Sequence, residues 1–129
     1  MLQSVPASPS QLPVRHHLLV CTTCGSQWVN GQREGISRGE ILLEKLQSLP
    51  WDPDWILKPV ECMSGCSHAC VVGFAAAHKT TYIFGDLEPD QAEVIQSTAQ
   101  LYRTKQDGIL PWAERPLKKG VIARIPGLE

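Results

Sequence analysis

The stretch VECMSGCSHACVV, residues 60–72, places three of the chain's five cysteines at intervals of four residues, between two apolar, strand-like runs. This spacing would align Cys62, Cys66 and Cys70 on one face of a helix. The two serines and the glycine among them oppose a helix, because serine competes for backbone hydrogen bonds and glycine costs about 1 kcal/mol. We therefore interpret the segment as a loop between strands, with a cysteine-lined helical stripe as the alternative.

The other two cysteines follow an apolar run near the start of the chain. VRHHLLV, residues 14–20, is short and suits a buried strand, and CTTC comes directly after it. The next segment, QWVNGQREGI at 27–36, is polar and glycine-rich, so we expect a loop there. Ser37 then opens SRGE, a capping-box pattern that predicts a helix ending at Leu49, before a proline.

The second half of the chain predicts three strands and one helix. WILKPVE at 55–61 favours a strand, and its proline suggests an edge position. VVGFAAA and TTYIFG indicate a hairpin whose two-residue turn is His78 and Lys79. Pro89 is placed for the first turn of a helix ending at Asp107 and Gly108. Its apolar stripe would comprise Val94, Ile95, Thr98, Leu101 and Tyr102.

These elements run strand, helix, strand, strand, strand, helix, which is the order of a thioredoxin-like α/β fold. We expect a four-stranded mixed sheet with flanking helices. A right-handed crossover would bring the end of the first strand and the loop after the second to one edge of the sheet. The domain would span 14–108, with a flexible tail at 1–13 and an extended arm at 109–129 packed on the domain.

Composition excludes several classes of function. The chain has 129 residues, a formal net charge of −1 and a sequence pI of about 6.4, which argues against nucleic acid as a partner. No apolar run is long enough for a membrane span, and the first residues do not form a signal peptide. We expect a cytoplasmic protein without membrane partners. Its reducing compartment and its odd cysteine count disfavour a disulfide framework.

Cys21, Cys24, Cys62 and Cys66 would converge from two loops in this fold. Four thiolates suit a tetrahedral sulfur site, which binds zinc or an iron–sulfur cluster. The spacing alone does not choose between these two. The first pair has the Cys-x2-Cys spacing of a zinc knuckle, whereas the wider Cys-x3-Cys of the second pair fits a two-iron cluster better.

VECMSGC resembles the second cysteine segment of thioredoxin-like [2Fe-2S] ferredoxins, a family that includes the small ferredoxin-like subunit of respiratory complex I. The resemblance implies that Cys21, Cys24, Cys62 and Cys66 bind a [2Fe-2S] cluster. The whole chain is also similar to a bacterial family of predicted metal-binding proteins related to these ferredoxins. We therefore expect a protein that transfers electrons or senses redox state with a redox partner protein, and that catalyses no bond chemistry itself.

Two positions depart from that family. The first pair is more tightly spaced than in the ferredoxins, and Cys70 stands where thioredoxin-like folds commonly carry a proline. Cys70 is thus a fifth thiol beside the cluster, an alternative ligand of the cluster, or a buried small residue at the start of a strand. Similarly, His68 could replace a thiolate, although a hydrogen-bonding role is commoner. We expect Gly25 and Gly65 to let backbone amides approach the sulfurs.

The sequence is also compatible with two other functions. The same thiolates could hold or deliver zinc in a metal-handling module. Alternatively, CTTC could be the redox pair of a dithiol oxidoreductase, since the reactive Cys-x-x-Cys of thioredoxins also follows the first strand. A second copy of the chain is a further candidate partner, which would make the protein a homodimer.

Overall fold

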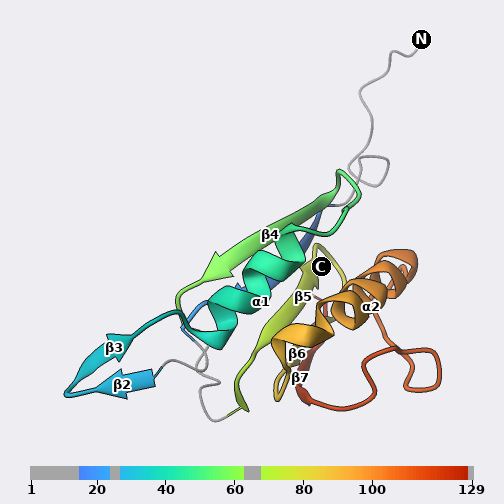
Figure 1. The fold of residues 1–129 in the computed structure, drawn as a ribbon. Helices are drawn as coiled ribbons and strands as arrows, with labels where there is room; N and C mark the ends of the chain where they lie inside the picture. Colours follow the sequence, from blue (N-terminus) through green and yellow to red (C-terminus); the bar gives the residue numbers. More distant parts are fainter. Residues whose placement is uncertain (1–14, 24–26, 63–67, 128–129) are drawn as a thin grey trace.

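The computed structural model describes residues 15–23, 27–62 and 68–127 (Figure 1). Its main sheet has five strands in the order β4-β1-β5-β6-β7. These are β1 (His16–Cys21), β4 (Trp55–Val60), β5 (Val72–Ala76), β6 (Thr81–Phe84) and β7 (Val121–Ile125). The helices are α1 (Arg38–Gln47) and α2 (Ala92–Thr104), the latter preceded by the 3-10 turn η3 (Pro89–Gln91).

The first strand–helix–strand unit has the expected topology. β1 and β4 are parallel, with His16 opposite Trp55 and Cys21 opposite Val60, and α1 connects them. β5 then joins the other side of β1 in the antiparallel sense, and β6 follows antiparallel to β5. β4 therefore lies at an edge, as its proline predicts.

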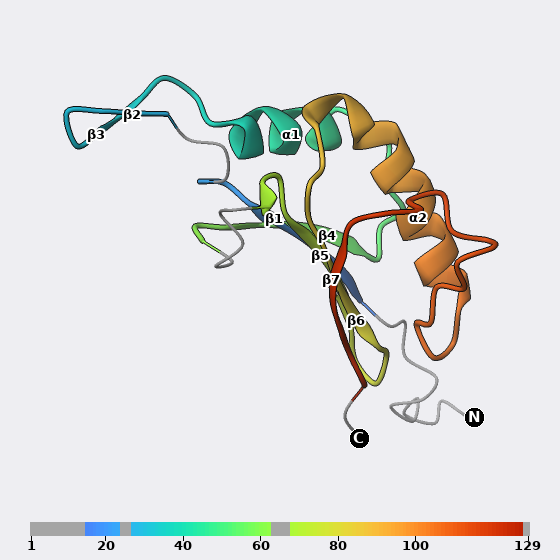
Figure 2. The same cartoon turned by 90° about the horizontal axis from the view of Figure 1, so that it is seen from below.

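Both helices cover the same face of the sheet (Figure 2). Strand alternation sends every second side chain toward them, so Leu18 and Val20 of β1 lie in the main core. His16 shares that face and is buried, whereas the adjacent His17 points to the other face and is half-buried. Aromatic and aliphatic side chains of both layers complete the core, among them Leu42, Leu46, Phe74, Tyr82, Phe84, Ile95 and Tyr102.

The expectation of a loop at 27–36 was wrong. This segment forms an antiparallel hairpin of β2 (Gln27–Val29) and β3 (Gln32–Glu34), and it projects from the rest of the domain (Figure 1). Asn30 and Gly31 connect the strands, both with positive φ, as a two-residue hairpin turn requires. The turn chemistry was visible in the sequence, but strands of three residues are too short to show an alternation of apolar and polar side chains.

The sheet also has one strand more than expected. The segment after residue 108 contributes β7, which pairs antiparallel with β6 and makes the sheet five-stranded. The strand begins after Gly120, where a Cβ would collide with the carbonyl oxygen of Gly85. Prolines and glycines dominate the arm, but VIARI is a β-branched run long enough to pair.

Smaller differences concern a turn and the second helix. The connection from β5 to β6 spans four residues, 77–80, rather than two. In α2, Ile95, Thr98 and Tyr102 of the expected stripe are buried, but Val94 is exposed. Within the described ranges, neither helix is long and apolar enough to cross a membrane.

Candidate metal centre

Cys21 and Cys62 lie at the same edge of the main sheet. Cys21 is the last residue of β1 and pairs with Val60, the last residue of β4, so the carboxyl ends of two parallel strands meet here. Cys62 follows Val60 by two residues. Cys21 is fully buried, whereas Cys62 is exposed. The topology thus brings the two cysteine segments together, although they are distant in the sequence.

Hydrogen bonds tie these segments to each other. The amide of Thr22 donates to the carbonyl of Val60 at 2.8 Å, and its hydroxyl donates to the same oxygen at 3.3 Å. The hydroxyl of Thr23 donates to the carbonyl of Glu61 at 2.5 Å, and the Cys21 Sγ lies 4.0 Å from that oxygen. The chain directly after Cys21 is therefore hydrogen-bonded to the chain directly before Cys62.

The start of α1 packs on the first cysteine segment. Ser37 and Glu40 form the predicted capping box, and the Ser37 hydroxyl also donates to the carbonyl of Thr22. Gly39 lies so close that an added Cβ would collide with the carbonyl oxygen of Cys21. We did not predict this role for Gly39, although glycine inside a helical pattern is a signal of close approach.

Cys70 has a different environment from Cys21. It lies two residues before β5, is fully buried in the main core, and exchanges backbone hydrogen bonds with Leu87. Cys21 instead packs with Val71 in a small cluster on the opposite face of the sheet. Burial raises the pKa of the Cys70 thiol, which keeps it protonated at neutral pH. The peptide bond between Ala69 and Cys70 is cis.

Part of the predicted site lies outside the described residues. This applies to Cys24 and Cys66, and also to Gly25 and Gly65. Among the residues that are described, no three His, Cys, Asp or Glu side chains form a metal-binding group. Cys21 and Cys62 come from the two segments that the parallel pair of β1 and β4 brings to one edge of the sheet.

His68 is paired with a carboxylate rather than grouped with the described cysteines. Its Nδ1 lies 3.2 Å from both carboxylate oxygens of Asp86, and the two side chains are half exposed or more. The amide of Asp86 also donates to the His68 carbonyl. These contacts connect the second cysteine segment to the chain after β6.

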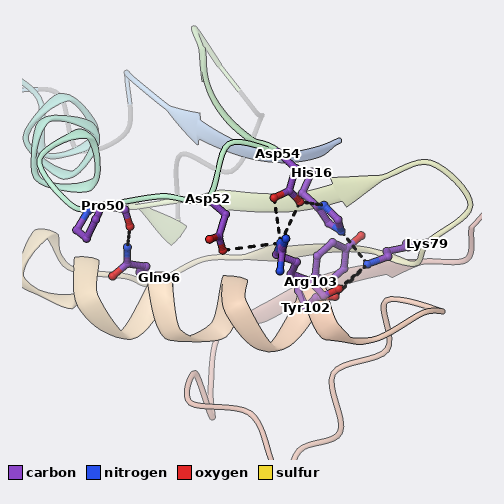
Figure 3. Close-up of polar contacts among 8 residues, drawn as sticks. All are labelled: His16, Pro50, Asp52, Asp54, Lys79, Gln96, Tyr102 and Arg103. Atoms are coloured by element: carbon purple, nitrogen blue, oxygen red, sulfur yellow. Dashed lines mark hydrogen bonds and ion pairs between the residues drawn. The ribbon is translucent and has the colours of Figure 1, made fainter. Parts of the chain in front are cut away.

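A second polar cluster occupies the opposite end of β1 (Figure 3). The Lys79 ammonium lies 2.8 Å from His16 Nε2 and donates to the carbonyls of Tyr102 and Arg103, each at 3.2 Å. His16 Nδ1 lies 2.9 Å from the carboxylate of Asp54. The arrangement fits a neutral imidazole that donates from Nδ1 and accepts at Nε2. Lys79 thereby uses all three ammonium donors.

Two pKa values in this cluster depart from their ordinary range. Burial lowers the pKa of Lys79, since it penalises the charged ammonium, while Asp54 acts in the opposite direction. Burial alone would raise the pKa of Asp54, but hydrogen bonds, chiefly from Arg103, lower it on balance. Both side-chain oxygens of Asp54 accept from Arg103 Nε at 3.0 Å. Lys79 and His16 are thus buried and hydrogen-bonded, and they connect β1 to the end of α2.

The five-stranded mixed sheet, with α1 and α2 on one face (Figure 2), defines an α/β fold. The chain belongs to the family described as "Protein of unknown function (DUF1636)", whose model matches residues 18–127. Among solved structures, it is similar to a thioredoxin-like [2Fe-2S] ferredoxin from Aquifex aeolicus. The match has a TM-score of 0.57 and 17% identity, and covers 89% of this chain and 98% of that chain. No curated protein sequence matches the chain.

Proposed function

We propose that this protein binds one [2Fe-2S] cluster through Cys21, Cys24, Cys62 and Cys66, and that it transfers electrons or senses redox state. The observation that carries the proposal is the meeting of the two cysteine segments at the carboxyl ends of β1 and β4. Thiolate sulfur is the donor that iron–sulfur clusters require. The cluster would supply one-electron chemistry, and a redox protein would be the partner.

The chain's own residues have defined tasks in this proposal. Thr23 and the capping residue Ser37 fix the backbone around the first ligand pair. Cys70 stays outside the ligand set as a buried core thiol, since its side chain packs among apolar residues on the face away from Cys21. Cys62 is exposed, which supports a centre with one edge at the surface, open to an electron partner.

The similarity to the Aquifex aeolicus ferredoxin supports this choice at the level of the fold. Zinc is the second candidate, because the Cys-x2-Cys spacing of Cys21 and Cys24 is typical of zinc knuckles. Zinc would give a structural or metal-handling site without redox chemistry, since Zn²⁺ is not redox-active. The two candidates share the same four ligands and differ in what is bound.

Purification without oxygen distinguishes the candidates. We expect a coloured protein with visible sulfur-to-iron absorption, containing two irons and two inorganic sulfides per chain. The absorption should bleach on reduction by dithionite and return on reoxidation. A colourless protein with stoichiometric zinc would contradict the cluster and support the zinc site. A metal-free protein with a reversible disulfide between Cys21 and Cys24, turned over by a reductase, would instead indicate a dithiol oxidoreductase.

A further inference from the structure

A pocket of about 470 Å³ lies where the chain before β7 passes the start of α2. Segment 116–120, which leads into β7, forms one side of it. The chain after β6, the turn η3 and the beginning of α2 form the other side. Its volume lies within the range of sites that bind small molecules. The residues on this second side are Gly85, Asp86, Leu87, Gln91 and Val94.

Hydrogen bonds anchor segment 116–120 at both ends. The amide of Leu117 donates to the hydroxyl of Thr98 in α2 at 3.1 Å. The amide of Gly85 donates to the carbonyl of Gly120 at 2.7 Å, directly after β6. The two sides of the pocket are therefore connected to each other above and below the space between them, and the pocket is built into the fold.

Arg115 supports the same segment from inside the domain. Its side chain is buried, and the guanidinium carbon lies 5.7 Å from the centre of the Phe84 ring. Buried charged groups in proteins are normally hydrogen-bonded, and this one is. Its nitrogens donate to the carbonyls of Leu110, Leu117 and Lys118, at 3.2, 2.6 and 3.3 Å.

One part of the pocket lining is apolar. It comprises Leu87, Val94, Pro116 and Leu117. Val94 was expected in the buried stripe of α2 but is 37% exposed, and it lines this pocket. An apolar group of a ligand would remove this surface from water.

The charged part of the lining is positive on balance, with two lysines against one aspartate. The Asp86 carboxylate already pairs with His68, at 3.2 Å. The Lys118 ammonium donates to the carbonyls of Trp112 and Ala113, so it contributes charge rather than a donor. Among the described residues, the ammonium of Lys119 has no hydrogen-bond partner.

Gln91 adds a neutral donor to the lining. Its Oε1 accepts from the amide of Glu88 at 2.8 Å, which fixes the side chain. Its Nε2 has no acceptor within the described part of the chain. Lys119 and Gln91 thus provide the donors that an anion needs, at a pocket whose other residues are largely apolar.

We propose that this pocket binds a small organic anion, a carboxylate or a phosphate ester that carries an apolar group. The apolar group packs on Leu87, Val94 and Leu117, and the anionic oxygens accept from Lys119 and Gln91. The inference goes beyond the proposed function and does not depend on what the cysteines bind.

Titration with three probes tests the class of ligand. The probes are phenyl phosphate and benzoate, with benzyl alcohol as an uncharged analogue. Proton–nitrogen NMR spectra of the whole chain follow each titration. We expect both anions to shift the amide signals of Leu87, Val94, Leu117 and Lys119 saturably, with Kd of roughly millimolar, as is usual for ligands of this size. Benzyl alcohol should bind several-fold more weakly.

Two variants separate the charged and the apolar contributions. Lys119→Gln should weaken both anions several-fold and leave benzyl alcohol unchanged, because only the charge-assisted hydrogen bond is lost. Val94→Ala should weaken all three probes by a similar factor, because apolar contact is lost. Lys45→Gln removes an exposed lysine of α1 outside the pocket lining, and it should bind all three probes as the wild type does. Circular dichroism verifies that each variant is folded.

Three results would overturn the inference. The first is the absence of saturable shifts with phenyl phosphate and benzoate, or shifts confined to amides away from the pocket. The second is equal affinity for benzyl alcohol and the anions, which would indicate a site for neutral apolar molecules. The third is an equal loss of affinity in Lys119→Gln and Lys45→Gln, which would indicate a general effect of protein charge. None of these results bears on cluster binding, which iron and sulfide content measures separately.

Discussion

The hydroxyl of Thr23 donates a 2.5 Å hydrogen bond to the backbone carbonyl of Glu61. Thr23 lies between Cys21 and Cys24, and Glu61 directly precedes Cys62, so one side chain connects both cysteine segments. The contact spans 38 residues of sequence. Parallel pairing of β1 and β4 brings the segments to one edge, and this bond fixes their separation.

Replacing Thr23 tests whether that connection supports metal binding. Thr23→Val keeps the shape of the side chain but loses the hydroxyl. A lost hydrogen bond costs about 1 kcal/mol, which corresponds to roughly a fivefold change in an equilibrium or rate constant. We expect iron to be lost several-fold faster to a chelator than from the wild type. Thr23→Ser keeps the donor and should release iron at close to the wild-type rate. Equal rates for Thr23→Val and the wild type would show that the bond is irrelevant to retention.

Gly39→Ala should destabilise the domain, against the usual trend for helices. Alanine in a helix interior is ordinarily about 1 kcal/mol more favourable than glycine. At this position the added methyl group would collide with the Cys21 carbonyl, and overpacking typically costs about 1–3 kcal/mol. The urea midpoint of metal-free protein measures the difference, with exposed Lys45→Ala on the same helix as the control. A higher midpoint for Gly39→Ala would refute the close approach of α1.

Lys79→Met should be among the more damaging substitutions away from the cysteines. It removes the donor to His16 and to the two carbonyls at the end of α2. Leaving buried acceptors unsatisfied costs about 1–3 kcal/mol. The free energy of unfolding by urea measures the loss, and Lys119→Met, at an exposed position, should change it little. Equal stability of the two variants would mean that the Lys79 network contributes nothing.

Asp54 should make stability depend on acid pH. Its pKa is lowered in the folded state from the ordinary value of 3.8, so the unfolded chain binds the proton more readily. The contribution of Asp54 is fully present above 3.8 and is lost as the pH falls through the lower folded value. The stability difference between wild type and Asp54→Asn should therefore shrink as the pH falls through this window. Urea unfolding of both proteins at a series of acid pH values tests this prediction. A stability difference that does not change with pH would contradict the lowered pKa of Asp54.

Much of the fold could be predicted where the signal is local. The Ser37 capping box, the strand at 55–61 and the pairing of the first two predicted strands all agree with the structure. The crossover rule for parallel strands then placed the cysteine segments at one edge. The division of the chain into a domain of 14–108 and an arm remains a prediction, as do the roles of Cys24 and Cys66.

Contacts between distant positions could not be predicted in the same way. Lys79 meets His16 across 63 residues, and no local pattern marks either side chain as buried. β7 depends on pairing with β6 rather than on its own periodicity, because most of its residues are exposed on both faces. The hairpin at 27–36 carried a recognisable Asn-Gly turn, but its strands of three residues are too short to show a strand pattern.

One comparison decides whether Cys62 belongs to a shared metal site that excludes Cys70. Iron and sulfide per chain are measured in Cys62→Ser and Cys70→Ala, both purified without oxygen beside the wild type. We predict that Cys62→Ser loses the cluster, whereas Cys70→Ala retains most of it at a somewhat lower stability. Loss of iron and sulfide in Cys70→Ala, or full loading of Cys62→Ser, would contradict the assignment of the ligands.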